Sequence, residues 1–280
     1  MSSFRTVAVA AGITIAAAMG TAQAADFPQP KEPDYIEPLP PMEMRGGVYI
    51  RGFVGMTNQD FRGLDFIELH DPNYQFTFLD KGSFDSGPLF GGGLGYQFNE
   101  WFRMDVTGEY RGKVDFTALD HAMWVGEGFP LEWTNDHRAK KSEWLILANA
   151  YLDLGTWKGL TPYVGAGIGA SRNTISNYRD INVSLNGVWY GDSHSKWNLA
   201  WALHAGLGFE VTDQLTLDLA YRYVNLGDAQ TGTVRHAWDD QTLTPMHFKR
   251  LTSHDVMLGL RWNFGHEKAY AQPKSGFFKN

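Results

Sequence analysis

The sequence predicts an all-β fold in which eight antiparallel strands follow one another in up-and-down order and close into a barrel. Three observations support this prediction. Apolar and polar residues alternate with a period of two along most of the chain after Gly46. Short and long connections alternate between these segments, and a connection of about three residues joins only antiparallel neighbours. No run of about 18 apolar residues follows Gly46, which excludes a protein that crosses a membrane with helices.

The alternating segments define the expected strands. The clearest one runs from Trp197 to Val211, where large apolar residues occupy one face and small or polar residues the other. The expected strands are 46–56, 87–98, 102–111, 142–154, 162–171, 197–211, 215–224 and 253–264. The connections 99–101, 155–161 and 212–214 are short, whereas 57–86, 113–141, 172–196 and 225–252 are long. All the long connections are therefore expected to emerge at the same end of the barrel.

Composition excludes several classes of function. The 280 residues carry a formal net charge of −7, whereas binding to nucleic acid depends on a surplus of lysine and arginine, so no nucleic-acid partner is expected. The chain contains no cysteine, which excludes disulfides, thiolate metal sites and cysteine nucleophiles. The histidines of the long connections have no metal-ligand spacing, so neither a metal nor a cofactor is expected.

The chain divides into four regions. The first has the pattern of a signal peptide, with an apolar run that is too short to cross a bilayer and with small residues around a cleavage point between Ala24 and Ala25. The second is rich in proline, which favours an extended and unpaired linker. The expected boundaries are 1–24 for the signal peptide, 25–45 for the linker, 46–264 for the barrel and 265–280 for a C-terminal tail.

The distribution of charge decides which face of the barrel points outward. A soluble barrel would have to enclose Trp197, Trp201 and Trp262, but an eight-stranded interior only has room for ordinary side chains or one small ligand. The apolar face is therefore expected to contact lipid, and the charged face to line the interior, as in transmembrane barrels. The expected interior charge network consists of Arg51, Arg103, Asp105, Glu109, Arg111, Glu143, Asp153, Glu210, Asp218, Arg222, Asp255 and Arg261.

Aromatic residues are expected to form two girdles at the edges of the lipid-contacting band, where ring bodies meet hydrocarbon and polar tips meet headgroups. The girdle near the short connections consists of Phe98, Phe102, Trp157, Phe209, Trp262 and Phe264, and the other of Tyr110, Trp144, Trp197, Tyr221 and Tyr223. Closure of the barrel leaves no unpaired strand edge in lipid. A soluble β-sandwich with one exposed face on each sheet is the alternative.

Four segments together resemble a known family. They are GGGLGYQFNEWFRMDVTGEYRGK at 91–113, NAYLDLG at 149–155, TPYVGAGIGAS at 161–171 and LDLAYRYVNLGDAQTG at 217–232. In this order, after a leader and a proline-rich entry, they are similar to the small outer-membrane β-barrels of alphaproteobacteria, which are porin-family surface antigens related in architecture to the OmpA transmembrane domain. The resemblance implies an outer-membrane location and a structural or surface-interaction role.

The expected location implies three kinds of partner: outer-membrane lipid and lipopolysaccharide, the outer-membrane assembly machinery, and an extracellular partner of the long loops. Members of the family commonly end in an aromatic residue that the assembly machinery recognises, whereas here a tail follows Phe264. Either Trp262 and Phe264 act as an internal signal, or Phe277 and Phe278 of the tail substitute for it.

The interior charges allow two interpretations. In the first, arginines and carboxylates pair across a narrow interior and fill it, which makes the barrel a scaffold. In the second, they line a narrow channel, which makes the protein a porin-like diffusion protein. The glycine-rich segments 91–95 and 165–169 do not indicate a phosphate site, because neither opens a helix. They are expected to leave room for large interior neighbours such as Arg103 and Tyr151.

A third interpretation is a lipid A-modifying enzyme with histidine, serine and an acid at the outer rim. Two segments raise it, namely 193–195 with His194 and 253–255 with His254. Neighbours in a strand point to opposite faces, however, so His254 is not expected to share a side with Ser253 and Asp255. The protein is therefore predicted to have no catalytic activity.

The long connections contain hydrophobic residues that could contact a partner. Those of the second are Met123, Trp124, Val125, Phe129, Leu131 and Trp133, and those of the third are Val188, Trp189 and Tyr190. The alternative is packing between loops, or strands that continue beyond the bilayer. The first connection is acidic, which favours solvation or contact with divalent cations among lipopolysaccharide headgroups. The sequence thus predicts a structural and surface protein that supports envelope integrity or surface interactions.

Overall fold

The structure of the protein is a computed structural model that describes residues 46–182 and 184–264. The predicted signal peptide with its cleavage point at Ala24 and Ala25, the linker and the tail lie outside the described residues. The strands are β1 (Gly47–Asp65), β2 (Tyr74–Phe84), β3 (Gly87–Gln97), β4 (Phe102–Trp124), β5 (Leu131–Asp153), β6 (Leu160–Asn182), β7 (Gly187–Gly191), β8 (His194–Glu210), β9 (Leu215–Gln230), β10 (Val234–His236), β11 (Thr242–Leu243) and β12 (His247–Phe264). One short 3-10 helix, Ile67–His70, precedes β2.

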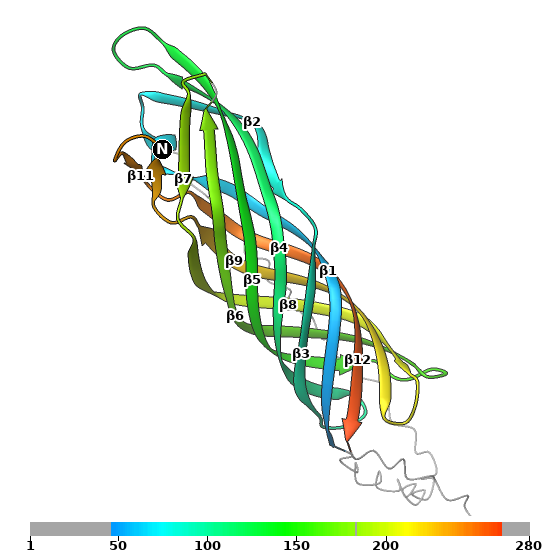
Figure 1. Cartoon of the computed structure of the whole chain (residues 1–280). Helices are drawn as coiled ribbons and strands as arrows, with labels where there is room; N and C mark the ends of the chain where they lie inside the picture. Colours follow the sequence, from blue (N-terminus) through cyan, green and yellow to red (C-terminus); the bar gives the residue numbers. More distant parts are fainter. Residues whose placement is uncertain (1–45, 183, 265–280) are drawn as a thin grey trace, which may run out of the picture. The chain divides into compact units, whose positions relative to one another are not determined.

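Eight of these strands form a closed ring. In ring order they are β1, β3, β4, β5, β6, β8, β9 and β12, and β12 pairs with β1 again (Figure 1). Every pair in the ring is antiparallel, and neighbours in the ring are consecutive strands of the meander that the sequence predicts. The predicted all-β, eight-stranded up-and-down barrel is therefore confirmed. No helix of the described residues is long and apolar enough to span a membrane.

The strands are longer than the sequence analysis predicted. β4, β5 and β6 contain 23 residues each, whereas a tilted strand needs only about 9 to 11 residues to cross a bilayer. The predictions of long connections at 57–86, 113–141, 172–196 and 225–252 are therefore wrong in large part, because both ends of each region continue the barrel. The alternative that strands extend beyond the bilayer is correct. We call the part beyond the lipid-facing band the extension.

The polarity of the barrel reverses between these two parts. In β4, Arg103 and Arg111 point inward, but the register shifts between Arg111 and Val114, and from there Val114 and Phe116 point inward instead. The extra residue of such a β-bulge moves every later side chain to the other face. The opposing strand β5 keeps its inward set without interruption. The lipid-facing half is thus apolar outside and charged inside, and the extension is the opposite.

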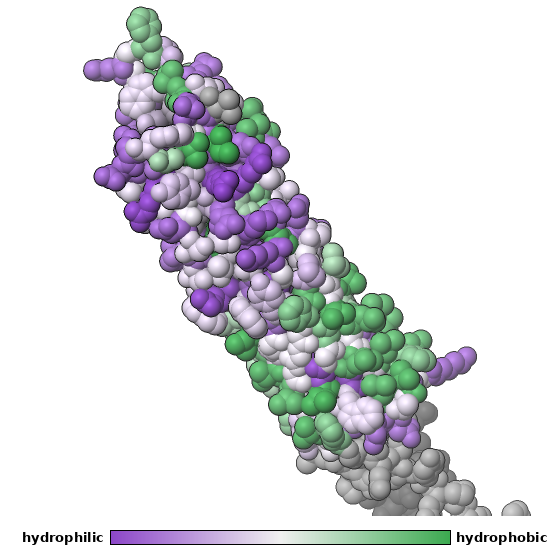
Figure 2. Space-filling model, in the orientation of Figure 1, coloured by the Kyte–Doolittle hydropathy of each residue, from purple (hydrophilic) through white to green (hydrophobic). Residues whose placement is uncertain are grey.

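The surface follows the same division. Figure 2 shows hydrophobic side chains gathered over the part of the barrel where β1 begins and β12 ends, and mainly hydrophilic side chains over the extension. Inside the extension lies an apolar core, in which the rings of Phe61, Phe84, Phe116 and Phe248 pack with centroid distances of 5.0 to 6.0 Å. A core of this kind is typical of a barrel that stands in water. The fold therefore joins a membrane-type barrel to a water-type barrel on the same strands.

Candidate functional site

The interior of the lipid-facing half contains two ion clusters. The first, nearer the short connections, consists of Arg51, Arg103, Asp105, Asp153, Asp218 and Arg261. The second, next to the apolar core of the extension, consists of Glu109, Arg111, Lys141, Glu143, Arg222 and Asp255. Each cluster contains three basic and three acidic side chains, so the charges balance locally. This balance matters because an unpaired charge in a closed interior is strongly destabilising.

Aromatic side chains complete the first cluster. Arg51 Nη1 lies 3.1 Å from Asp105 Oδ2 and also donates to the Tyr151 hydroxyl at 3.0 Å. Arg103 Nε donates to Asp153 Oδ1 at 3.1 Å, and its guanidinium lies 4.2 and 4.5 Å from the ring centroids of Tyr151 and Tyr163. Among the described residues, Arg103 Nη1 and Nη2 have no hydrogen-bond partner. The faces of the two rings therefore stabilise the part of this charge that hydrogen bonds do not reach.

Two-point ion pairs hold the second cluster together. Arg111 donates from Nη1 and Nη2 to the two oxygens of Asp255 at 2.8 and 2.9 Å. Its Nε lies 2.6 Å from Glu143 Oε2, and Lys141 forms an ion pair with the other oxygen of Glu143. Bidentate pairs of this kind fix both orientation and distance. The cluster residues come from β4, β5, β9 and β12. Lys141 also donates to Gln59, which adds β1 to the strands that these side chains join.

Eleven of the twelve residues predicted for the interior network lie inside the barrel, each at most 8% exposed. Glu210 is the correction: it lies exposed at the end of β8. Its position in the alternation is inward, but it is the last residue of β8, and its side chain is exposed there. Lys141 was missed because the predicted strand began one residue after it. Side chains that lined a water-filled channel would be open to water, so the described interior is closed at the level of both clusters.

The glycine-rich segments lie in strands β3 and β6 and face large side chains. A Cβ atom on Gly165 would lie 2.5 Å from the ring of Tyr151, and one on Gly95 would lie 2.2 Å from the ring of Tyr49. Neither segment opens a helix. The prediction that these glycines make room for interior side chains is therefore confirmed for Tyr151.

The two histidine segments do not form a catalytic arrangement. His254 points outward and its Nδ1 lies 2.6 Å from the Tyr221 hydroxyl, whereas Ser253 and Asp255 are fully buried inside. The predicted separation of these side chains is confirmed. His194 Nε2 lies 3.3 Å from Gln230 Nε2. Among the described residues, no group of three or more histidines and carboxylates has the geometry of a metal site.

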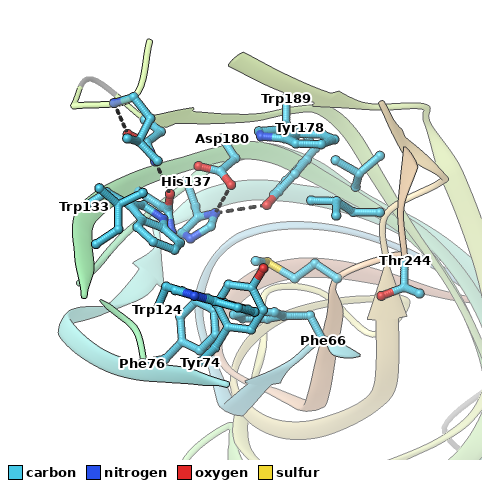
Figure 3. Close-up of a pocket in the computed structure, with 17 residues that line it drawn as sticks. Phe66, Tyr74, Phe76, Trp124, Trp133, His137, Tyr178, Asp180, Trp189 and Thr244 are labelled. Carbon is cyan, nitrogen blue, oxygen red and sulfur yellow. Dashed lines mark hydrogen bonds and ion pairs between the residues drawn. The ribbon is translucent and has the colours of Figure 1, made fainter. Parts of the chain in front are cut away.

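A cavity of about 370 Å³ lies in the extension, and we call it the outer cavity. Figure 3 shows Tyr74, Phe76 and Trp124 on one side of it, and His137 and Asp180 on the other. The side chains come from β2, β4, β5 and β6, all of them in segments that the sequence analysis assigned wholly or partly to long connections. Trp124, Leu131, Trp133 and Trp189, which were predicted to contact a partner or to pack between loops, are among its lining residues.

A buried hydrogen-bond network forms the polar wall of the outer cavity. His137 Nε2 lies 2.7 Å from Asp120 Oδ2, and Nδ1 lies 2.9 Å from the Tyr178 hydroxyl. Asn135 donates to Asp120 Oδ1 at 2.8 Å, and Asp180 Oδ2 lies 3.9 Å from His137 Nδ1. Burial lowers the pKa of His137, but the hydrogen bond to Asp120 and the neighbouring carboxylates outweigh burial, so its pKa is raised above the ordinary value. His137 is therefore a packed and charge-paired residue.

Comparison with known proteins decides the family. The family model described as outer membrane protein beta-barrel domain matches residues 9–266, which is most of the chain. The chain belongs to this outer-membrane β-barrel family. The outer membrane is accordingly its location, as the sequence analysis predicted.

Several relatives of this outer-membrane barrel are known. An uncharacterised protein of Brucella abortus is 34% identical over 209 residues, which cover 69% of this chain and 73% of the relative. The outer membrane protein PagN of Salmonella typhimurium is 29% identical, with 78% of this chain and 90% of that protein covered. Among solved structures, Neisserial surface protein A is similar with a TM-score of 0.43 and 16% identity, covering 78% of this chain and 97% of that one.

The aromatic side chains predicted for the girdles of the outer-membrane barrel lie on its outside. Trp144, Trp197 and Trp157 are 51%, 58% and 61% exposed, and Tyr110, Phe102 and Tyr223 are half-buried between outward neighbours. Arg172 is exposed and lies opposite Trp144 on one side and Trp197 on the other. An exposed arginine between two tryptophans is typical of the boundary between hydrocarbon and headgroups.

Proposed function

We propose that this outer-membrane barrel is a non-catalytic scaffold that carries its extension outside the bilayer as a rigid surface for interactions. One observation carries the proposal: the strands continue past the lipid-facing band with reversed polarity. Inward-facing Phe116 and Phe248 are fully buried there, while charged residues such as Asp115 and Lys140 pair on the outside. Such a barrel needs water around it. Beneath it, the residues of the two ion clusters are buried in the described interior, which supports a scaffold over a channel.

The names of relatives support a surface role. PagN of Salmonella typhimurium is an outer membrane protein, and a Rickettsia conorii protein that is 26% identical over 61% of this chain is proposed to be an adhesin. Solvent-exposed hydrophobic side chains at the tip of the extension, such as Phe129 at 95% exposure and Tyr190 at 44%, provide contact points for an extracellular partner.

Lipopolysaccharide is the proposed partner at the outer rim of the lipid-facing band. Arg172 places a positive charge between Trp144 and Trp197, where the phosphates of the outer leaflet lie. The acidic first connection, for which the sequence favours solvation or contact with divalent cations, contains Asp65, which lies 3.4 Å from Lys249 Nζ and 2.8 Å from His70 Nε2. Those internal pairs favour solvation and folding of the segment over cation binding.

Labelling of single cysteines tests the placement of the extension, because the natural chain contains no cysteine. Thr117 lies on the outer face of the extension and Val106 lies on the lipid-facing band, so the two variants are Thr117→Cys and Val106→Cys. We expect a membrane-impermeant maleimide to label Thr117→Cys on intact cells and to leave Val106→Cys unlabelled. Equal labelling of both, or labelling of Thr117→Cys only after the outer membrane is broken, would overturn the proposal.

Two measurements test the absence of transport and catalysis. In planar lipid bilayers, we expect the purified barrel to give no large and stable openings, because both ion clusters are closed. Large stable openings would establish the channel alternative. Mass spectrometry of lipid A from a deletion strain is expected to give an unchanged profile, and a changed profile that the restored gene reverses would establish the enzyme alternative.

A further inference from the structure

The outer cavity offers aromatic faces to a ligand. Tyr74 lies between two tryptophans, with ring centroids 4.9 Å from Trp124 and 6.2 Å from Trp133 and interplanar angles of 73° and 87°. These side chains are half-buried, and all three line the cavity. At about 370 Å³, the cavity falls within the range of sites for small molecules.

The opposite side of the cavity is acidic. His137 and Asp180 lie on it (Figure 3), and Asp120 stands behind His137 in the buried network. The described residues that line the cavity include neither lysine nor arginine. Among the described residues, the carboxylates of Asp180 on the wall and Asp120 behind it lie beside the one imidazole of His137. An anionic ligand would be repelled here.

We propose that the outer cavity binds an organic ammonium cation, whose apolar substituents contact Tyr74, Trp124 and Trp133 and whose charge is stabilised by their ring faces and by Asp180. Cations of this kind combine weak hydration with positive charge, and tryptophan has the ring face that attracts them most strongly. A neutral apolar ligand would make no use of the carboxylate of Asp180, which lines the cavity. The inference deepens the proposed surface role, since it gives the extension a ligand of defined chemistry.

Isothermal titration calorimetry on the purified full chain tests the site, in a detergent such as octyl glucoside that carries no ammonium group. The probes are choline, benzyltrimethylammonium and 3,3-dimethylbutanol, the uncharged carbon analogue of choline. We expect both cations to bind, and the uncharged analogue to bind at least about tenfold more weakly. Equal binding of choline and its uncharged analogue, or no binding of either cation, would overturn the proposal.

Matched variants locate the binding. Asp180→Asn and Trp133→Leu are each expected to weaken benzyltrimethylammonium binding about tenfold. Asp136→Asn removes the same charge from the outer face of β5, and Trp238→Leu removes an exposed tryptophan that does not line the cavity; both are expected to leave the affinity unchanged. Equal losses in the control variants would contradict the site, provided that all four variants keep the heat-dependent gel mobility of the folded barrel.

A last comparison separates two sources of the cation. If the natural ligand is a free ammonium compound, we expect choline to bind and phosphocholine not to bind, because the phosphate would meet the acidic wall. If the natural ligand is a lipid headgroup, we expect phosphocholine to bind as tightly as choline. Either result supports an ammonium site. The titration does not depend on where the extension lies in the cell, whereas the cysteine labelling does, so the two experiments can fail independently.

Discussion

Arg222 and Glu109, which lie 113 residues apart in the chain, form a two-point ion pair inside the barrel. Arg222 Nη1 donates to Glu109 Oε2 at 2.8 Å and Nη2 donates to Oε1 at 2.6 Å. Both side chains are at most 2% exposed. The pair joins β9 to β4 across the barrel interior, and Arg222 also donates to Asp255 of β12 at 2.9 and 2.7 Å. Loss of either partner leaves a charge that water does not reach.

We predict that Glu109→Ala lowers the free energy of unfolding by about 3 to 5 kcal/mol, as is typical when one partner of a buried ion pair is removed. Arg103→Ala of the first cluster is expected to have a similar effect, since it leaves the buried carboxylate of Asp153 without this ion pair. Denaturant unfolding followed by tryptophan fluorescence in detergent measures both. Asp136→Ala, which removes half of an exposed pair with Arg138, serves as the control and should leave the unfolding midpoint unchanged.

A double substitution distinguishes charge from packing. Glu109→Leu combined with Arg222→Met removes both partners and keeps apolar volume, so we expect it to be closer to the natural protein than Glu109→Ala alone. If Glu109→Ala and Arg103→Ala shift neither the unfolding midpoint nor the heat-dependent gel mobility, the ion clusters do not stabilise the barrel.

We predict that Gly95→Ala destabilises the barrel by about 1 to 3 kcal/mol, as overpacking of a filled interior generally does. The added Cβ atom would lie 2.2 Å from Tyr49 Cζ, and Tyr49 is fully buried with its hydroxyl bonded to Asp105. Gly108→Ala is the matched control, because its Cβ atom would meet nothing within 4 Å on the lipid-facing side. A Tyr49→Leu background should remove most of the difference, and an equal loss at Gly95 and Gly108 would show that Tyr49 is not the cause.

The sequence predicted the lipid-facing half almost completely, because its alternation states directly which side chain faces which medium. Arg103, Asp105 and Glu109 stand at odd-numbered positions and point inward, whereas Met104 and Val106 stand at even-numbered positions and point outward. The alternation therefore gives both the register and the face of each side chain. Ion pairs such as Arg111 with Asp255 do not follow from parity, since 144 residues separate them and only closure of the ring brings them together.

The sequence analysis left continued strands as an alternative, but it did not predict their boundaries or their reversed polarity, for a physical reason. One extra residue at the bulge between Arg111 and Val114 reverses the parity of β4, and the same reversal accompanies Asn177 in β6, which has a φ of 53°. In the extension the charged residues alternate on the outer face. A sequence analysis that expects apolar residues on that face, as in the lipid-facing half, therefore assigns such a segment to a polar loop. The outer cavity was not predicted either, because Asp120 and Asp180 come from β4 and β6, which do not pair with each other and lie on either side of β5.

We predict that Arg172→Glu weakens the binding of lipopolysaccharide to the barrel. The substitution places a negative charge between Trp144 and Trp197, where phosphates of the outer leaflet would be repelled. The measurement is the rise in melting temperature when purified lipopolysaccharide is added, which reports binding to the folded state. Arg179→Glu is the control on the same strand: Arg179 is also exposed but lies in the extension, opposite Tyr190. Equal losses in the two variants would indicate general electrostatics and not a rim site.

His137 and His247 give the extension two opposite dependences on pH. The pKa of His137 is raised, because the hydrogen bond to Asp120 and nearby carboxylates outweigh burial. Its contribution to stability is therefore complete below the unfolded pKa of about 6.5 and is lost as the pH rises through the higher folded pKa. Burial and the charges of Lys249 and Lys196 lower the pKa of His247, so that group contributes in the opposite direction.

We predict that His137→Gln removes a pH-dependent part of the stability and leaves the part due to His247. Between about pH 5.5 and 8.5, the difference in melting temperature between the natural protein and the variant should be largest at the acidic end and shrink as the pH rises, because the natural protein loses the proton that Asp120 stabilises. Thermal unfolding of both proteins in the same buffers measures this difference, and His247 cancels because both proteins contain it. A difference that is independent of pH would mean that His137 stabilises the extension by packing alone, without a charge on its ring.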